Sequence, residues 1–231
     1  MLPPLDIKQI YQSFDSPVTS FDCGQKCAPH HPKGIPFCCD ICQAVPAAYR
    51  QEWDYLQTRS DLWHIWQGNE CAEEPCDPAD LQAETPESML LLACKGPAAC
   101  ERHFRTISCR QFPFFPYITS DDRFTGLAYH WDFEETCWVI SHLAAVSQTY
   151  RHEFVRLYDE IFALWEEDFD AYAATSEDLR DYFAAQKRRF PLLHRNGGYY
   201  LVSPGSERKQ AVTPDRFRRF GPYRHERPAG K

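Results

Sequence analysis

The stretch LLACKGPAACERHFRTISCRQFPFFP at residues 91–116 decides how this chain is organised. The apolar run at 88–93 predicts a short buried strand that leads directly into Cys94. A Gly-Pro turn separates Cys94 from Cys100, so both thiols can point to one place, and Cys109 follows shortly before an aromatic run. Sulfur ligands at short spacing suit zinc or iron–sulfur clusters, so this stretch predicts a metal centre.

A second group of cysteines lies upstream, in FDCGQKCAPHHPKGIPFCCDIC at residues 21–42. Its prolines and Gly34 predict a loop, and ligands on a loop can adapt to a tetrahedral site. Cys39 and Cys42 form a C-x2-C pair, which can chelate one ion from a tight knuckle. The predicted ligand pool, from which four thiolates would bind directly, is Cys23, Cys27, Cys38, Cys39, Cys42, Cys94, Cys100, Cys109 and Cys137.

The main alternative treats the cysteines as small core residues, because the thiol side chain is commonly buried. This alternative suits one or two of them. It does not suit Cys38, Cys39 and Cys42, because a proline-rich loop has no apolar face to bury. Cys71 and Cys76 lie in an acidic loop, and for these two the alternative is favoured, so we interpret them as spare thiols or a weak secondary pair.

Histidines also lie among the cysteines. His30, His31 and His103 could each give an imidazole ligand to the same ion, but the favoured interpretation is that they face solvent on loops. The segment 130–135, HWDFEE, could form a hard-metal or acid–base group. Its carboxylates are also well placed to cap the N-terminus of a helix, which is the favoured interpretation.

The composition predicts a protein with a real core: 43% of its 231 residues are hydrophobic and 15% are aromatic. The N-terminus lacks a basic start and an apolar signal segment, and no apolar run approaches the roughly 20 residues of a membrane span. We therefore expect a cytoplasmic protein that does not contact membranes. In that compartment thiols stay reduced, so the odd number of cysteines, eleven, indicates ligands rather than a disulfide framework.

Charge is distributed unevenly along the chain. Residues 187–231 carry a formal charge of +9 and the rest carries −17, for a total of −8. The favoured interpretation is that this basic tail packs on its own acidic body or on an acidic protein partner or substrate; the alternative is contact with a polyanion. We do not expect nucleic-acid binding, because no helix-turn-helix, finger or RNA-binding signature is present. Walker, Rossmann and nucleophile-elbow motifs are also absent.

The secondary-structure pattern predicts an α+β fold, in which a cysteine-rich metal-binding domain with a small sheet and loops packs on long C-terminal helices. Helical spacing is expected within 47–67 and, more strongly, from 134 to about 190 as one long helix or two. A second helix would begin after Thr175, where Thr175 and Asp178 have the spacing of a capping box. A hairpin is expected at 197–214. The resulting division is a domain at 1–186 and a basic extension at 187–231.

The central block resembles that of the zinc- or iron-chelating cysteine-cluster (YkgJ-like) family. Cys94, Cys100 and Cys109 fall at the ligand positions of the family motif, and its C-R-x-F-P ending is intact. Cys137 would be the family's late cysteine. Its first block would be Cys23, Cys27, Cys38 and Cys39.

The chain departs from the family pattern at several places, one of which is the extra Cys42 after the Cys38–Cys39 doublet. The first block is stretched, with ten residues between Cys27 and Cys38, and Thr106 follows Arg105 where the family has proline. The likeness covers roughly residues 20–140. It implies a metal or iron–sulfur binder, and some members are associated with protein lysine methylation.

Iron–sulfur ligation is favoured over zinc because the chain has more than four clustered cysteines within an aromatic shell. The predicted function is a metal-binding protein that carries a cluster, of the 4Fe–4S type, with a redox or protein-modifying role. We expect Arg110 to orient a thiolate. The alternative is a zinc-stapled interaction module, not an enzyme, that contacts a partner through the basic tail. A radical-SAM centre is rejected because Cys23 and Cys27 lack the third cysteine of that motif.

Overall fold

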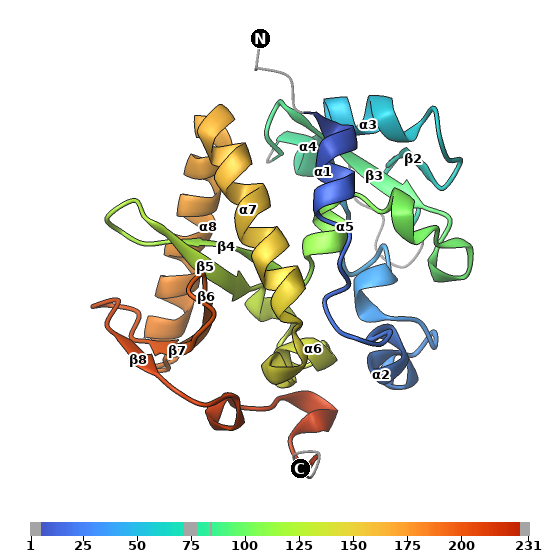
Figure 1. The fold of residues 1–231 in the computed structure, drawn as a ribbon. Coiled ribbons are helices and arrows are strands. Elements are labelled where there is room, and N and C mark those ends of the chain that lie inside the picture. The colour runs from blue at the N-terminus through green and yellow to red at the C-terminus, as the bar shows by residue number, and fades with distance from the viewer. Residues whose placement is uncertain (1–5, 72–77, 84, 227–231) are drawn as a thin grey trace. The chain divides into compact units, whose positions relative to one another are not determined.

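The chain forms two compact units in a computed structural model that describes residues 6–71, 78–83 and 85–226 (Figure 1). Unit 1 contains Ser16–Phe21 and the chain from Pro113 onward. Unit 2 contains the described residues before Ser16 together with Asp22–Phe112. Both units mix helices and strands, so the α+β class is confirmed at that level. The expected boundary between residues 186 and 187 lies inside unit 1, and Cys76 lies outside the described residues.

Unit 2 is built on a three-stranded antiparallel sheet in the order β1-β3-β2. Its strands are β1 (Ala47–Tyr49), β2 (Trp63–Ile65) and β3 (Met89–Cys94). Its helices are α1 (Ile7–Ser13), α2 (Gly24–Cys27), α3 (Arg50–Leu56), α4 (Pro78–Ala83) and α5 (Ile107–Gln111). The central strand β3 is the apolar run expected at 88–93, and it ends on Cys94 as predicted.

The helix expected within 47–67 is only partly present. Helix α3 covers the middle of that range, but β1 precedes it and β2 follows it. The two strands form because they border β3 and satisfy the backbone hydrogen bonds on its two edges. Trp63, which shares the aromatic pattern, lies in β2 opposite Cys94. Pairing with a distant strand therefore overrides the local helical spacing.

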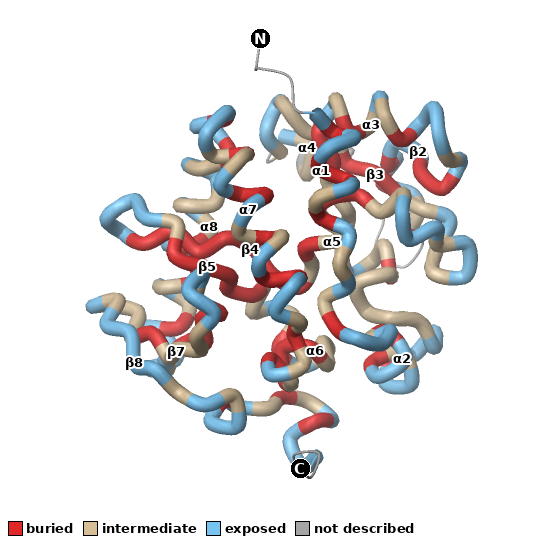
Figure 2. Tube along the Cα trace, viewed as in Figure 1, coloured by how far each residue is buried: buried red, intermediate tan, exposed pale blue. Residues whose placement is uncertain are grey.

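Unit 1 is built on a five-stranded antiparallel sheet in the order β4-β5-β6-β7-β8. Its strands are β4 (Phe114–Ile118), β5 (Phe124–Tyr129), β6 (Phe190–His194), β7 (Tyr199–Val202) and β8 (Lys209–Ala211). Its helices are α6 (Trp138–Ser141), α7 (Gln148–Leu164) and α8 (Glu166–Ala185). The buried stretches coloured in Figure 2 include β4 and β5, whose aromatic side chains form much of this unit's core.

Aromatic rings join the long helices to this sheet. Phe114 of β4 lies 6.1 Å, centroid to centroid, from Tyr150 of α7, and Tyr129 of β5 lies 6.4 Å from Phe183 of α8. The Oγ of Ser176, also on α8, accepts the backbone N–H of β4 at Ile118. The apolar stripe read from the sequence is therefore the packing face of both helices.

Two long helices are present, but the break between them is not where the sequence predicted it. Trp165 adopts an extended conformation and separates α7 from α8, and its side chain is buried. Thr175 lies in the middle of α8, where its hydroxyl donates to the carbonyl of Ala171 instead of capping a helix. The expected start after Thr175 is therefore wrong. A bulky aromatic residue that is fixed by packing terminates α7 without a proline or glycine signal.

The basic tail packs on acidic residues of its own unit. Three of its arginines form ion pairs at 2.7–2.8 Å, which are Arg188 with Glu134, Arg195 with Asp159, and Arg224 with Glu135. The first pair is bidentate, and Glu134 also accepts the hydroxyl of Tyr129. For these arginines, the favoured interpretation of the tail is confirmed. The acidic group at 130–135 accordingly serves as an anchor for the tail.

The hairpin expected at 197–214 is confirmed as β7 and β8. Within the part of the chain that the structure describes, no helix combines the length and the apolar character needed to cross a bilayer.

Gly126 provides a test of the unit 1 sheet. Its φ is +152°, and a Cβ added there would lie 2.3 Å from the carbonyl oxygen of Leu193 on the paired strand. We expect Gly126→Ala to reduce the free energy of unfolding by about 3 kcal/mol, because backbone strain and a backbone clash act together. Urea unfolding would measure this loss. Gly205→Ala is the matched control, since nothing lies within 4 Å of its added Cβ; equal losses would contradict the argument.

Candidate metal centre

Within unit 2, cysteines from the two predicted groups lie near enough for their charges to interact. Electrostatic interactions link Cys39, from the upstream loop, to Cys94 and Cys109, from the central block, and Cys94 to Cys100. None of these four is in a disulfide. The group formed by Cys39, Cys94, Cys100 and Cys109, called the thiol group below, therefore joins segments that are more than 50 residues apart in the sequence.

Packing explains how the upstream loop reaches the end of β3. Ile41, two residues after Cys39, packs with Val45 against a buried cluster of Trp66, Leu91 and Ala93. Leu91 and Ala93 belong to β3, so burial of Ile41 draws the loop toward the strand that carries Cys94. The loop has a short apolar contact after all, which its proline content did not indicate.

In the turn after β3, a backbone N–H points at the sulfur of Cys94. The N–H of Gly96 lies 3.4 Å from Cys94 Sγ, and Gly96 has a φ of +87°, which favours glycine. Burial raises the pKa of Cys94; the Gly96 N–H opposes this, while Cys39 and Cys100 add to it. A backbone N–H directed at sulfur is the arrangement expected around a thiolate ligand.

Arg105 contacts the thiol group directly, whereas Arg110 does not. The Nε of Arg105 lies 3.0 Å from Cys100 Sγ. Although burial lowers the pKa of Arg105, its hydrogen bond to Cys100 and the nearby thiols raise it overall. Arg110 donates instead to backbone carbonyls, those of Phe14, His103 and Arg105. The expectation that Arg110 orients a thiolate is therefore wrong in this structure, because the backbone carbonyls occupy its guanidinium.

Cys109 lies on α5, and Thr106 caps this helix. The hydroxyl of Thr106 accepts the N–H of Cys109 at 3.2 Å and caps the N-terminus of α5, an interaction that proline cannot make. Burial raises the pKa of Cys109 to about 12; Cys39 adds to the increase and Arg105 opposes it. A thiol in this setting stays protonated until a cation replaces its proton.

Cys38 and Cys39 form a short helical turn with Phe37. A side-chain hydrogen bond from Cys38 is the main influence that lowers the pKa of Cys39, burial opposes it, and the charge of Arg105 supports it. Cys39 is thus the member of the thiol group that is most readily ionised among those whose pKa is shifted.

The remaining predicted ligands lie in different settings. Cys27 is buried, its Sγ lies 3.6 Å from the carbonyl oxygen of Gly24, and burial raises its pKa. Cys23 precedes α2 and is half-buried. Cys137 precedes α6 and belongs to unit 1.

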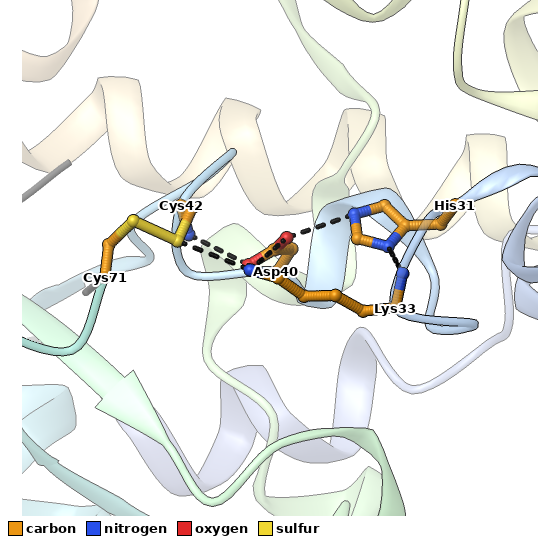
Figure 3. The surroundings of a disulfide bond; sticks show 5 residues. All are labelled: His31, Lys33, Asp40, Cys42 and Cys71. Carbon is orange, nitrogen blue, oxygen red and sulfur yellow. Dashed lines mark hydrogen bonds and ion pairs between the residues drawn. A yellow bond between two sulfur atoms is a disulfide. The ribbon is translucent and has the colours of Figure 1, made fainter. Parts of the chain in front are cut away.

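Cys42, predicted to be a ligand, is bonded to Cys71 (Figure 3). This disulfide removes Cys42 from the ligand pool in this structure and shows that Cys71 is not a spare thiol. The physical reason is proximity. Cys71 lies shortly after β2, and Trp66, directly after β2, belongs to the buried cluster against which Ile41, next to Cys42, packs. The expected absence of disulfides is therefore wrong at this pair.

His31 is buried and does not face solvent. Its Nε2 lies 3.0 Å from a carboxylate oxygen of Asp40, and its Nδ1 accepts the N–H of Lys33 (Figure 3). Both ring nitrogens are therefore engaged within the loop, which leaves no lone pair for a metal ion. Burial would raise the pKa of Asp40, but the N–H of Cys42 and the ammonium of Lys33 outweigh it and lower that pKa.

Glu52 ties the element that carries Cys109 to the rest of unit 2. Its side chain is fully buried and accepts the hydroxyl of Tyr11 and the N–H of Ile107, both at 2.7 Å, as well as the N–H of Tyr49. Burial raises the pKa of Glu52 to about 7, although these hydrogen bonds oppose the shift. The sequence does not reveal Glu52, Asp40 or the role of Arg105 as parts of this site, because their partners are distant in the chain or not distinguished by spacing.

Among the described residues, no set of three or more His, Cys, Asp or Glu side chains is arranged to hold a metal ion as it stands. No protein-family model, curated protein or solved structure matches this chain. The resemblance to the cysteine-cluster family therefore stays a prediction.

We expect the disulfide to be directly detectable. Digestion without reductant should yield one cross-linked peptide that contains Cys42 and Cys71, and Cys71→Ser should leave Cys42 open to alkylation by iodoacetamide. Mass spectrometry of the labelled peptides measures both. Cys76→Ser is the control and should leave Cys42 unlabelled. Labelling of Cys42 in the unmodified, unreduced protein would contradict the pairing.

Glu52 should make stability depend on pH. A carboxyl whose pKa is raised on folding contributes stability that is complete below the unfolded pKa of about 4.3 and is lost as pH rises toward 7. Relative to Glu52→Gln, the protein should lose about 3 kcal/mol between pH 4 and pH 7.5. Urea unfolding at both pH values, with the exposed Glu87→Gln as the control, measures the difference. If the free energy of unfolding fell equally in the parent protein and in Glu52→Gln between these pH values, the argument would be contradicted.

Proposed function

We propose that this protein binds a thiolate-ligated metal centre, an iron–sulfur cluster in the first instance, on the thiol group of unit 2. Cys39, Cys94, Cys100 and Cys109 are the ligands of this proposal. The observation that supports it is that four cysteines, none in a disulfide, interact electrostatically across a loop, a strand end, a turn and a helix, and that Arg105 contacts one of them. Cys38 lies next to the group and could serve in place of one member.

The chemistry of the group suits such a centre. Two of its members have raised pKa values and one has a lowered pKa. A bound cation would displace the protons of these thiols, because the metal ligand is the thiolate. An all-sulfur set is soft and selects zinc or iron–sulfur clusters over magnesium or calcium. When bound, an iron–sulfur cluster supplies one-electron redox chemistry.

The alternative is zinc at the same cysteines, acting as a structural staple. The other half of that alternative is a partner bound by the basic tail. Three of the tail's twelve basic residues, Arg188, Arg195 and Arg224, are paired within unit 1 and are not offered to a partner.

Elemental analysis of protein prepared without oxygen tests the proposal. Iron and acid-labile sulfide with broad visible absorption would support a cluster, and stoichiometric zinc in a colourless protein would support the alternative. Cys94→Ser and Cys109→Ser should lose most of the bound metal, because each removes a ligand from the group. Cys76→Ser, outside the expected ligand pool, should retain it. Protein that binds neither metal, or variants that bind as well as the parent, would refute the proposal.

A further inference from the structure

Arg105 reaches the thiol group from a short helical turn. Its Nε is 3.0 Å from Cys100 Sγ, and its charge also acts on Cys39 and Cys109. Its side chain is half-buried. Arg102, three residues earlier, is exposed. An arginine of this segment is therefore not directed at the thiol group merely by its place in the sequence.

The backbone that carries Arg105 is held by a second arginine. Arg110 donates from Nε to the carbonyl of Arg105 at 3.0 Å and from Nη2 to the carbonyl of His103 at 2.7 Å. Its Nη1 donates to the carbonyl of Phe14 in the α1 segment at 2.6 Å, and its guanidinium lies 4.1 Å from the ring centre of Tyr11. The turn that carries Arg105 is therefore held in place by hydrogen bonds to its backbone carbonyls.

A metal centre at four thiolates is stabilised by such a cation. Four thiolates around a divalent ion, or around an oxidised four-iron cluster, carry two more negative charges than positive ones. Burying that excess is unfavourable unless a fixed positive charge lies nearby. A guanidinium N–H directed at sulfur compensates charge and fixes the direction of the ligand at the same time.

We propose that Arg105 is the positioning residue of this centre: it directs Cys100 toward the metal and balances the charge of the ligated thiolates. This inference rests on the proposed function and extends it to a residue that is not a ligand. In a cluster-loaded protein, a hydrogen bond to sulfur and a nearby positive charge both favour the reduced, more negative state. Arg105 therefore also raises the reduction potential of the centre.

Three variants separate charge from shape. Arg105→Gln removes the charge and keeps a donor, Arg105→Lys keeps the charge and loses the planar fork, and Arg102→Gln is the matched exposed control. Zinc affinity is measured on full-length reduced protein by competition with a chromophoric chelator. We expect about 10- to 100-fold weaker binding in Arg105→Gln, a smaller loss in Arg105→Lys, and no change in Arg102→Gln.

The reduction potential provides a readout that a merely structural role would not move. In protein with a reconstituted cluster, Arg105→Gln should have a lower potential than the parent, and Arg105→Lys should recover part of the difference. If the parent binds metal and Arg105→Gln matches it in affinity and potential, the role of Arg105 is refuted while the metal site stands. If the parent binds no metal, the proposed function fails, and this inference fails with it.

Discussion

The buried carboxylate of Glu52 is the constraint on which unit 2 depends. It receives hydrogen bonds from Tyr11, Tyr49 and Ile107, which belong to three separate segments of the chain. A fully buried carboxyl is tolerated only when its oxygens are satisfied, so each segment must occupy its place for the others to be stable. Helix α5 is thereby fixed relative to α3 and the edge of the sheet, and α5 carries Cys109.

The thiol group is constrained by repulsion, because its cysteines would repel one another if they ionised together. The structure handles this with unequal surroundings. Cys39 has a lowered pKa beside Cys38, Cys94 and Cys109 have raised ones, and Arg105 lies against Cys100. Burial therefore favours the protonated thiol at Cys94 and Cys109, and a bound cation would favour the thiolate there.

The upstream loop has two kinds of cysteine rather than one. Cys39 belongs to the thiol group, while Cys42 is bonded to Cys71 and its N–H is held by Asp40. The ammonium of Lys33 lies 3.6 Å from Cys42 Sγ and also contacts Asp40. The two cysteines of the C-x2-C pair, Cys39 and Cys42, thus have different roles. The disulfide holds the end of the loop that precedes β1.

The sequence by itself determined the parts whose information is local. Strand β3 was evident from an apolar run, the β7–β8 hairpin from its turn, and the helical stripe of α7 and α8 from its periodicity. The clustering of thiols was also expected, because cysteines at short spacing on loops and strand ends have few other uses. Which of these cysteines bind a metal stays a prediction.

Only the tertiary structure decided the rest, because it depends on partners distant in the chain. The break at Trp165 depends on burial, the pairing of Cys42 with Cys71 depends on the packing of Ile41 near Trp66, and His31 is engaged by Asp40. Two arginines five residues apart look alike in the sequence. One meets backbone carbonyls and the other meets a thiol, because the folded chain, and not the spacing, determines which acceptors lie within reach of each guanidinium.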